Sequence, residues 1–324
     1  MIRFRMVAGI LGTLIAVAVA FAMLDWPVLL RAFAQLSFGA LAAAAVLSLL
    51  TTLVLSLRWA VLAAPADRNL GRREFRDALV AHVFNLVTPA AAGADVYRVI
   101  IAGDRGGGRG RAASLVVLER LLGIAGYALV FLLCFAVVSV DRRNLAVFSA
   151  AAPAFAVAAA LPLIPMFLAR LISARSQLPA GDRIPEGLKA ALAGLVGVSP
   201  KRGIAALGLS ILGAMIWLAC FVVVASAVGV GIDRATVGMS AIVAEFSRLL
   251  PISVQGIGVR EATFAFLAAK AGGSFEAAFA ACATAYALHF ALIAFVAFTA
   301  RCGILPRVTN EMRQLAAQFL RGVQ

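Results

Sequence analysis

The chain has 324 residues, of which 63% are hydrophobic, and a mean hydropathy of +1.01. This composition, with apolar runs near the ~20 residues that a helix needs to cross a bilayer, excludes an ordinary soluble domain. The formal net charge of +14 could suggest nucleic-acid binding. However, the Lys and Arg residues cluster between apolar runs, as in loops that face an anionic leaflet, and no aromatic-interleaved basic strand accompanies them. The sequence therefore predicts an integral membrane protein with no nucleic-acid partner.

The four cysteines show no sign of a metal or disulfide set. They have no CxxC spacing and no histidine at ligand spacing, and three of them lie inside apolar runs. Such cysteines behave as small packing residues. We therefore predict no metal site and no cofactor from Cys134, Cys220, Cys282 and Cys302.

Six long apolar runs predict helices that cross the membrane. They cover residues 6–24, 36–57, 112–140, 145–169, 203–232 and 276–300. The first run follows two arginines and contains A-x-A sequences, as a cleaved signal peptide does, but we favour a retained span because further spans follow it. Two further hydrophobic regions are interrupted near the middle. We call residues 74–102 the first broken region and residues 235–271 the second broken region.

The distribution of basic residues predicts the orientation of the chain. If the N-terminus is cytoplasmic and each broken region returns to the side from which it came, most Lys and Arg residues fall in cytoplasmic segments, as the positive-inside rule requires. The arms 94–102 and 259–271 give only about 14 and 20 Å of helix, against a bilayer core of about 30 Å. We therefore expect re-entrant arms, both termini in the cytoplasm, and a multi-pass protein of the bacterial cytoplasmic (inner) membrane.

The order of these segments repeats along the chain. Two spans, a broken region and a span occupy about 1–140, and the same order fills about 141–302. Three crossings per half force the second half to insert upside down, which is the inverted-repeat plan of many transporters. We predict an all-α, polytopic membrane helix bundle with two inverted repeats and broken re-entrant helices. It forms a single transmembrane domain over 1–302, followed by an amphipathic cytoplasmic tail at 303–324.

The second broken region contains Pro251, Gly256, Gly258, Arg260 and Glu261 in the stretch LPISVQGIGVREA. Backbone that the proline and glycines leave unpaired is tolerated at membrane depth only inside protein or beside water. The N-terminus of the following helix, together with Arg260, would suit an anion such as a lipid phosphate. In the alternative interpretation, Glu261 neutralises Arg260, the turn permits tight helix packing, and the pair snorkels to the outer interface.

The first broken region offers a similar set in the stretch FNLVTPAAAGADVYR. Its proline precedes its arginine by the same spacing as in the second broken region, and its candidate residues are Asn85, Asp95 and Arg98. Asp95 is a candidate helix cap, and substrate binding and packing are equally open for this set. Glu119 and Arg120 follow inside the next span, where exposure to lipid is costly. We favour an ion pair with another helix over a substrate contact for these two.

Other polar residues in apolar surroundings have structural interpretations. Glu245 and Arg248 are three residues apart and can pair on one helix face. His82 and His289 have no His, Asp or Glu at metal spacing. His82 is the better candidate of the two for a polar cavity residue.

Three stretches resemble the signature regions of a known family. NLVTPAAAGADVYR, LVVLERLLG and LPISVQGIGVREA are similar to those of the lysylphosphatidylglycerol synthase transmembrane-domain family, also called flippase-like membrane proteins, and the resemblance covers about 36–300. Members are implicated in moving aminoacylated phosphatidylglycerol, polyprenyl-linked sugars or hopanoid-type lipids across bacterial or archaeal membranes. The chain departs from the family pattern at Gln255, where a glycine is common, and at Ala90 and Ala94. The candidate substrate-binding residues on these motifs are Asn85, Asp95, Arg98, Glu119, Arg120, Gly256, Gly258, Arg260 and Glu261.

The resemblance and the broken regions together lead to an expected function. We expect a lipid flippase or transporter in which Arg98 and Arg260 alternately hold an anionic or polyprenyl-linked headgroup, so that its partners are membrane lipids. The competing functions are a membrane subunit or intramembrane enzyme of cell-envelope lipid modification, and a non-catalytic scaffold for envelope-biosynthesis enzymes. The sequence shows no catalytic constellation, and too few residues follow Cys302 for an aminoacyl-transferase domain, so we expect no enzyme activity.

Overall fold

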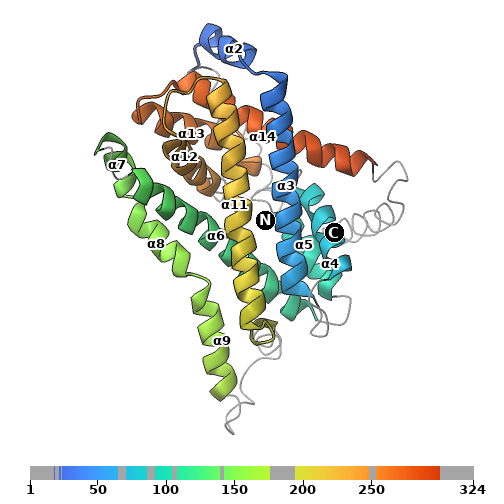
Figure 1. Cartoon of the computed structure of the whole chain (residues 1–324). Coiled ribbons are helices and arrows are strands. Elements are labelled where there is room, and N and C mark those ends of the chain that lie inside the picture. The colour runs from blue at the N-terminus through green and yellow to red at the C-terminus, as the bar shows by residue number, and fades with distance from the viewer. Residues whose placement is uncertain are drawn as a thin grey trace.

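The computed structural model describes residues 18, 22, 24–64, 71–85, 92–103, 108–138, 142–175, 194–247 and 253–299. Within these ranges all regular structure is helical, and the protein is an all-α polytopic membrane helix bundle (Figure 1). The elements are α2 (Trp26–Ala34), α3 (Phe38–Ala63), α4 (Arg72–Asn85), α5 (Ala92–Ala102), α6 (Arg109–Val138), α7 (Arg142–Ser149), α8 (Ala152–Ala160), α9 (Leu163–Arg175), α11 (Pro200–Ala227), α12 (Arg234–Ser247), η4 (Val254–Gly256), α13 (Val259–Lys270) and α14 (Phe275–Thr299).

Four helices, α3, α6, α11 and α14, are long and apolar enough to cross a membrane. They correspond to the predicted spans 36–57, 112–140, 203–232 and 276–300. The Ser37 hydroxyl accepts a hydrogen bond from the Ala40 N–H at 3.1 Å and so caps the first turn of α3. The predicted span 6–24 falls almost entirely outside the described residues, and so do the tail 303–324, Pro89 and Pro251.

The predicted span 145–169 is wrong as one continuous helix. The structure divides this stretch among α7, α8 and α9, which are separated by short turns. Pro153 stands in the first turn of α8, and Pro162 lies in the turn that precedes α9. Proline lacks the N–H that would bond the preceding turn, and its ring clashes with the carbonyl four residues earlier, so a helix restarts at these positions.

Each broken region forms a pair of short helices that pack against each other. The first gives α4 and α5, and the second gives α12 and α13 with η4 between them. At 1.5 Å per residue, these helices are about 16 to 21 Å long, which is too short for a bilayer core of about 30 Å. The four short helices therefore do not cross the membrane individually.

The helices follow the same order of contacts in the two halves of the chain. In the first half α3 packs on α4, α4 on α5 and α5 on α6; in the second half α11 packs on α12, α12 on α13 and α13 on α14. The long helices α3 and α11 pack along each other and run antiparallel, since Arg202 contacts Ala64 at one end of the pair and Cys220 contacts Ala44 towards the other. Figure 1 shows α4 and α5 at one end of this pair and α12 and α13 at the opposite end. The superposition of the halves about a two-fold axis stays a prediction.

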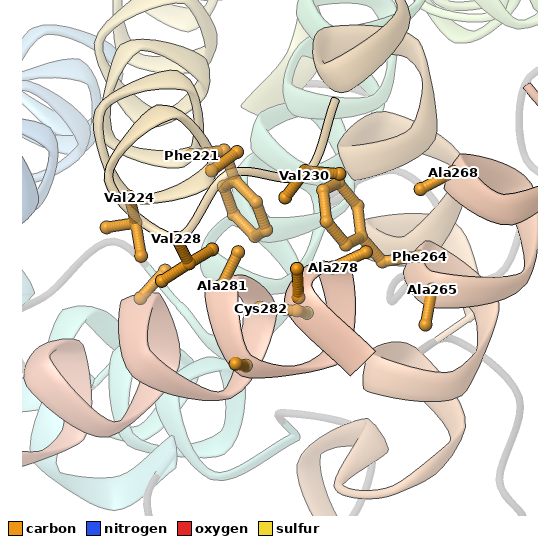
Figure 2. Close-up of a cluster of buried hydrophobic side chains, with 14 of the residues drawn as sticks. Phe221, Val224, Val228, Val230, Phe264, Ala265, Ala268, Ala278, Ala281 and Cys282 are labelled. Atoms are coloured by element: carbon orange, nitrogen blue, oxygen red, sulfur yellow. The ribbon is translucent and has the colours of Figure 1, made fainter. Parts of the chain in front are cut away.

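The largest apolar core lies where the C-terminal end of α11 meets α13 and α14 (Figure 2). Phe221 from α11 and Phe264 from α13 pack with their rings tilted by 54° and their centroids 5.3 Å apart, and alanines of α14 fill the space beside them. Small residues let these helices approach closely, which is how helices associate where lipid supplies no hydrophobic driving force. Cys220 and Cys282 are buried in this core as free cysteines, so their predicted role as packing residues is confirmed.

Candidate functional site

A buried carboxylate between two arginines is the centre of the polar interior. Glu119 on α6 accepts a hydrogen bond from Arg58 on α3 at 2.8 Å and forms a second ion pair with Arg98 on α5. Arg58 also donates to the hydroxyl of Ser210 on α11, at 3.2 Å. Glu119 is 2% exposed and Arg98 is 6% exposed. The first broken region is therefore tied to three long helices through one charge cluster.

Arg120 and Asp95 form a second ion pair beside this cluster, between α6 and α5. The predicted pairing of Glu119 and Arg120 with other helices is thus confirmed. The prediction that Asp95 caps a helix is wrong, because Asp95 lies inside the first turn of α5 and its carboxylate is bonded to Arg120. The cap comes instead from Asn85, at the end of α4, whose side-chain oxygen accepts a hydrogen bond from the Ala94 N–H at 2.9 Å.

The second broken region turns through a run of residues in the left-handed part of conformational space. Gln255, Gly256 and Gly258 have φ of 56°, 75° and 82°. Glycine adopts such angles without strain, whereas a residue with a Cβ adopts them only where its surroundings hold it. Gln255 is held from both sides: its carbonyl accepts a hydrogen bond from Arg260 at 3.1 Å, and its side-chain amide donates to the carbonyl of Asn85. This last bond joins the second broken region to the first.

Arg260 is almost fully enclosed by its own loop and by α14. It is 1% exposed, it forms an ion pair with Glu261 at 3.1 Å, and its guanidinium lies over the ring of Tyr286. Glu261 in turn accepts a hydrogen bond from the Gly258 N–H at 2.6 Å. Its negative charge therefore lies at the N-terminus of α13, where the helix dipole favours an anion. The alternative in which this pair snorkels to the outer interface is wrong, because both side chains are buried.

Two adjoining cavities lie between the broken regions. The larger, of about 180 Å³, is lined by Asn85, Asp95, Arg98, Glu119 and Arg120 of the predicted site, together with Arg58 and Ser210. The smaller, of about 100 Å³, is lined by Thr51, Thr52, Gln255, Arg260 and aromatic side chains of α11 and α14. Five residues face both cavities: Leu55, His82, Asn85, Tyr127 and Glu245. We call the two cavities together the polar tract.

His82 and Glu245 lie where the two cavities meet. The sequence favoured a structural role for His82, but the residue lines both cavities, and its Nε2 is buried with no hydrogen-bond partner among the described residues. Glu245 accepts hydrogen bonds from Trp217 at 2.8 Å and from Tyr286. Its predicted partner Arg248 lies outside the described residues. His289 forms a hydrogen bond with Ser48 at 2.9 Å and lines the smaller cavity.

The structure brings seven of the nine predicted residues to the polar tract or to its direct partners. The larger cavity collects the first set, Arg260 lines the smaller cavity, and Glu261 binds Arg260. Gly256 and Gly258 shape the backbone and line neither cavity. Sequence reasoning missed Arg58, which stands just after the apolar run 36–57 and looks there like an ordinary cytoplasmic flank. The available signal was its position in the sequence. Arg58 is one residue beyond a predicted span and close enough along the same helix to share a face with polar residues.

A comparison with family models matches residues 6–297 to the lysylphosphatidylglycerol synthase TM region. The match includes both broken regions, the Glu119-Arg120 pair, the whole of α3, α6 and α11, and nearly all of α14. No curated protein and no solved structure is a match to this chain. With most of its length covered by this model, the chain is an integral membrane protein that belongs to the lysylphosphatidylglycerol synthase TM region family.

Proposed function

We propose that this protein moves a lipid with an anionic headgroup between the two leaflets of the bacterial inner membrane. The observation that carries the proposal is the polar tract, in which two short helix pairs at opposite ends of the α3–α11 pair are joined by the contact between Asn85 and Gln255. Broken helices that meet in the interior of a bundle are the usual way in which transporters build a substrate site.

The chemistry of the tract supports an anionic headgroup. Arginine side chains from four different elements face its cavities: Arg58, Arg98, Arg120 and Arg260. Guanidinium groups bind phosphate with a fork of donors that stays charged at every physiological pH. In the proposed cycle the headgroup travels through the tract while its acyl chains remain in the bilayer, with both termini of the protein on the cytoplasmic side.

The test is a headgroup-access assay in proteoliposomes. The purified full chain is reconstituted with trace amounts of headgroup-labelled lipids, and the fraction that an impermeant quencher reaches is followed over time. We expect labelled anionic lipids to cross faster than in protein-free vesicles, and zwitterionic lipids of the same chain length to cross more slowly than the anionic ones. If no lipid in the panel crosses faster than in protein-free vesicles, the proposed function is wrong.

A second readout separates translocation from an enzyme that modifies lipids. Lipids recovered from the same proteoliposomes are analysed by mass spectrometry. The proposal predicts that the lipids which cross keep their mass. Recovery of a covalently changed headgroup would favour the intramembrane enzyme of envelope lipid modification instead.

A further inference from the structure

The ion pairs around the larger cavity are not all one to one. Arg120 is matched by Asp95, but Arg58 and Arg98 share the single carboxylate of Glu119. This trio is buried and carries one surplus positive charge. Glu245, the third carboxylate that lines this cavity, accepts hydrogen bonds from Trp217 and Tyr286. Two buried arginines that share one carboxylate are costly, so the trio is expected to serve a ligand that supplies a second negative charge.

The two guanidinium groups retain donors that nothing in the described part of the chain accepts. The Nε atoms of both Arg58 and Arg98 are buried and have no hydrogen-bond partner among the described residues. Both side chains line the 180 Å³ cavity, and Arg98 is 6% exposed. Removing a donor from water without giving it an acceptor is unfavourable. Arg260 also has a buried Nε without a hydrogen-bond partner among the described residues, but Arg260 has Glu261 as its own counter-ion, whereas Arg58 and Arg98 share one carboxylate.

We propose that Arg58 and Arg98 form a seat for one singly charged phosphodiester group, which joins Glu119 as the second anion between the two guanidiniums. The inference rests on the proposed function and assigns its headgroup contact to the first broken region. Arg260 has a different role, since its ion pair with Glu261 and its bond to Gln255 already use it within its own loop.

Lipid binding by the full chain in detergent tests the proposed phosphodiester seat directly. Titration calorimetry is performed with inorganic phosphate, with a short-chain phosphodiester lipid, and with the diacylglycerol of the same chain length. We expect the phosphodiester lipid to bind and the diacylglycerol not to bind. Binding of inorganic phosphate with the same affinity as the lipid would contradict a lipid seat, because the site would then read a free anion.

Two arginine substitutions test the assignment without unbalancing the fold. Arg58→Gln or Arg98→Gln each leaves Glu119 with one arginine, so the remaining pair is charge-matched. Each is expected to weaken binding of the phosphodiester lipid about tenfold or more, the loss of one charge-assisted hydrogen-bonding partner. The matched control is Lys270→Gln, which removes the same charge from an exposed site on α13 and should leave the affinity unchanged.

Glu119→Gln is expected to change the binding affinity in the opposite direction. No purely structural role of Arg58, Arg98 and Glu119 predicts this result. The substitution raises the surplus to two positive charges and should tighten binding of the same lipid about tenfold or more. The lipid should also raise the melting temperature of this variant more than that of the unmodified protein, because ligands stabilise the state that binds them. Unchanged binding in folded Arg58→Gln and Arg98→Gln proteins would overturn the proposal, as would a folded Glu119→Gln protein that binds no more tightly.

The binding and transport experiments can contradict the two proposals independently of each other. If the lipid binds through Arg58 and Arg98 but no lipid crosses in proteoliposomes, the seat stands and the proposed translocation is wrong. If lipids cross while the Arg58→Gln and Arg98→Gln variants keep full affinity, translocation stands and the seat is wrong.

Discussion

Arg260 shows how a single residue can hold an interrupted helix in place. Its guanidinium donates to the carbonyl of Gln255, a residue with φ of 56°, and to the carboxylate of Glu261, which accepts a hydrogen bond from the Gly258 N–H at the start of α13. A residue with a Cβ in the left-handed region costs about 1–3 kcal/mol, and the conformation persists only where its surroundings hold it. Arg260 therefore stabilises the loop that lines the smaller cavity.

Arg260→Ala is expected to lower lipid translocation about tenfold or more. The change removes charge-assisted hydrogen bonds that contribute roughly 1.5–3 kcal/mol each. Arg260→Lys should rescue the rate only in part, because lysine keeps the charge and loses the planar fork. The measurement is the proteoliposome rate per folded, inserted molecule, with Lys270→Ala on the same helix as the control. A correctly folded Arg260→Ala protein with the normal rate would contradict this role.

The sequence was a good guide to which residues are polar and buried, and a weaker guide to their partners. Arg98 and Glu119 were identified because they are charged residues within motifs in apolar surroundings. A charge in such surroundings must find a partner within the protein. The sequence could not identify Arg58 as the second partner of Glu119, since α3 and α6 are far apart in the sequence and only their packing brings these side chains together. Asn85 was identified for substrate, but its observed contacts are a helix cap and the link to Gln255.

At the scale of the elements, the close approach of α6 and α11 positions the cluster around Glu119. Gly126 on α6 faces Ser210 on α11, and a Cβ at Gly126 would lie 2.7 Å from the Cβ of Ser210 and 2.8 Å from its backbone carbonyl carbon. The same Ser210 receives the hydrogen bond from Arg58. The short distance between α6 and α11 thus keeps Ser210, the second partner of Arg58, close to Glu119.

Gly126→Ala is expected to lower the melting temperature, because backbone must move to admit the methyl group, and overpacking of this kind costs about 1–3 kcal/mol. The matched control is Gly208→Ala on α11, where a Cβ would meet nothing within 4 Å. That change should be neutral or stabilising by up to about 1 kcal/mol, since alanine favours helix over glycine. Equal melting temperatures for the two variants would show that this helix contact is not tight.

The elements themselves were predictable to different degrees. Long apolar runs and short broken arms follow from hydropathy and length, and the structure has both. The division of 145–169 into α7, α8 and α9 was missed because hydropathy does not register that proline interrupts backbone hydrogen bonding inside an apolar run. Pro153 and Pro162 were the available signals.

At the scale of the whole molecule, the two short helix pairs lie at opposite ends of the α3–α11 pair and meet through Asn85 and Gln255. This arrangement agrees with opposite insertion of the two halves, which the count of crossings predicts. Opposite insertion places the starts of the two broken regions on different sides of the membrane.

Cysteine accessibility tests this orientation. In a background without the native cysteines, Lys201→Cys at the start of α11 should react with an impermeant thiol reagent only from the cytoplasmic side, because basic segments stay inside. Ala269→Cys near the end of α13 should react only from the outer side. Both residues are exposed, so each label can reach its target. Reaction of both positions from the same side would contradict opposite insertion.

The central claim, that a headgroup passes through the polar tract, is tested most directly by blocking the tract at its middle. Leu55 on α3 faces both cavities, whereas Leu49 on the same helix is 42% exposed on the outer surface. In the cysteine-free background, Leu55→Cys and Leu49→Cys proteins are reconstituted, modified with a bulky thiol reagent, and assayed for lipid translocation. We predict that modification of Leu55→Cys stops translocation and that modification of Leu49→Cys does not. A fully modified Leu55→Cys protein that moves lipid at the unmodified rate would contradict the claim.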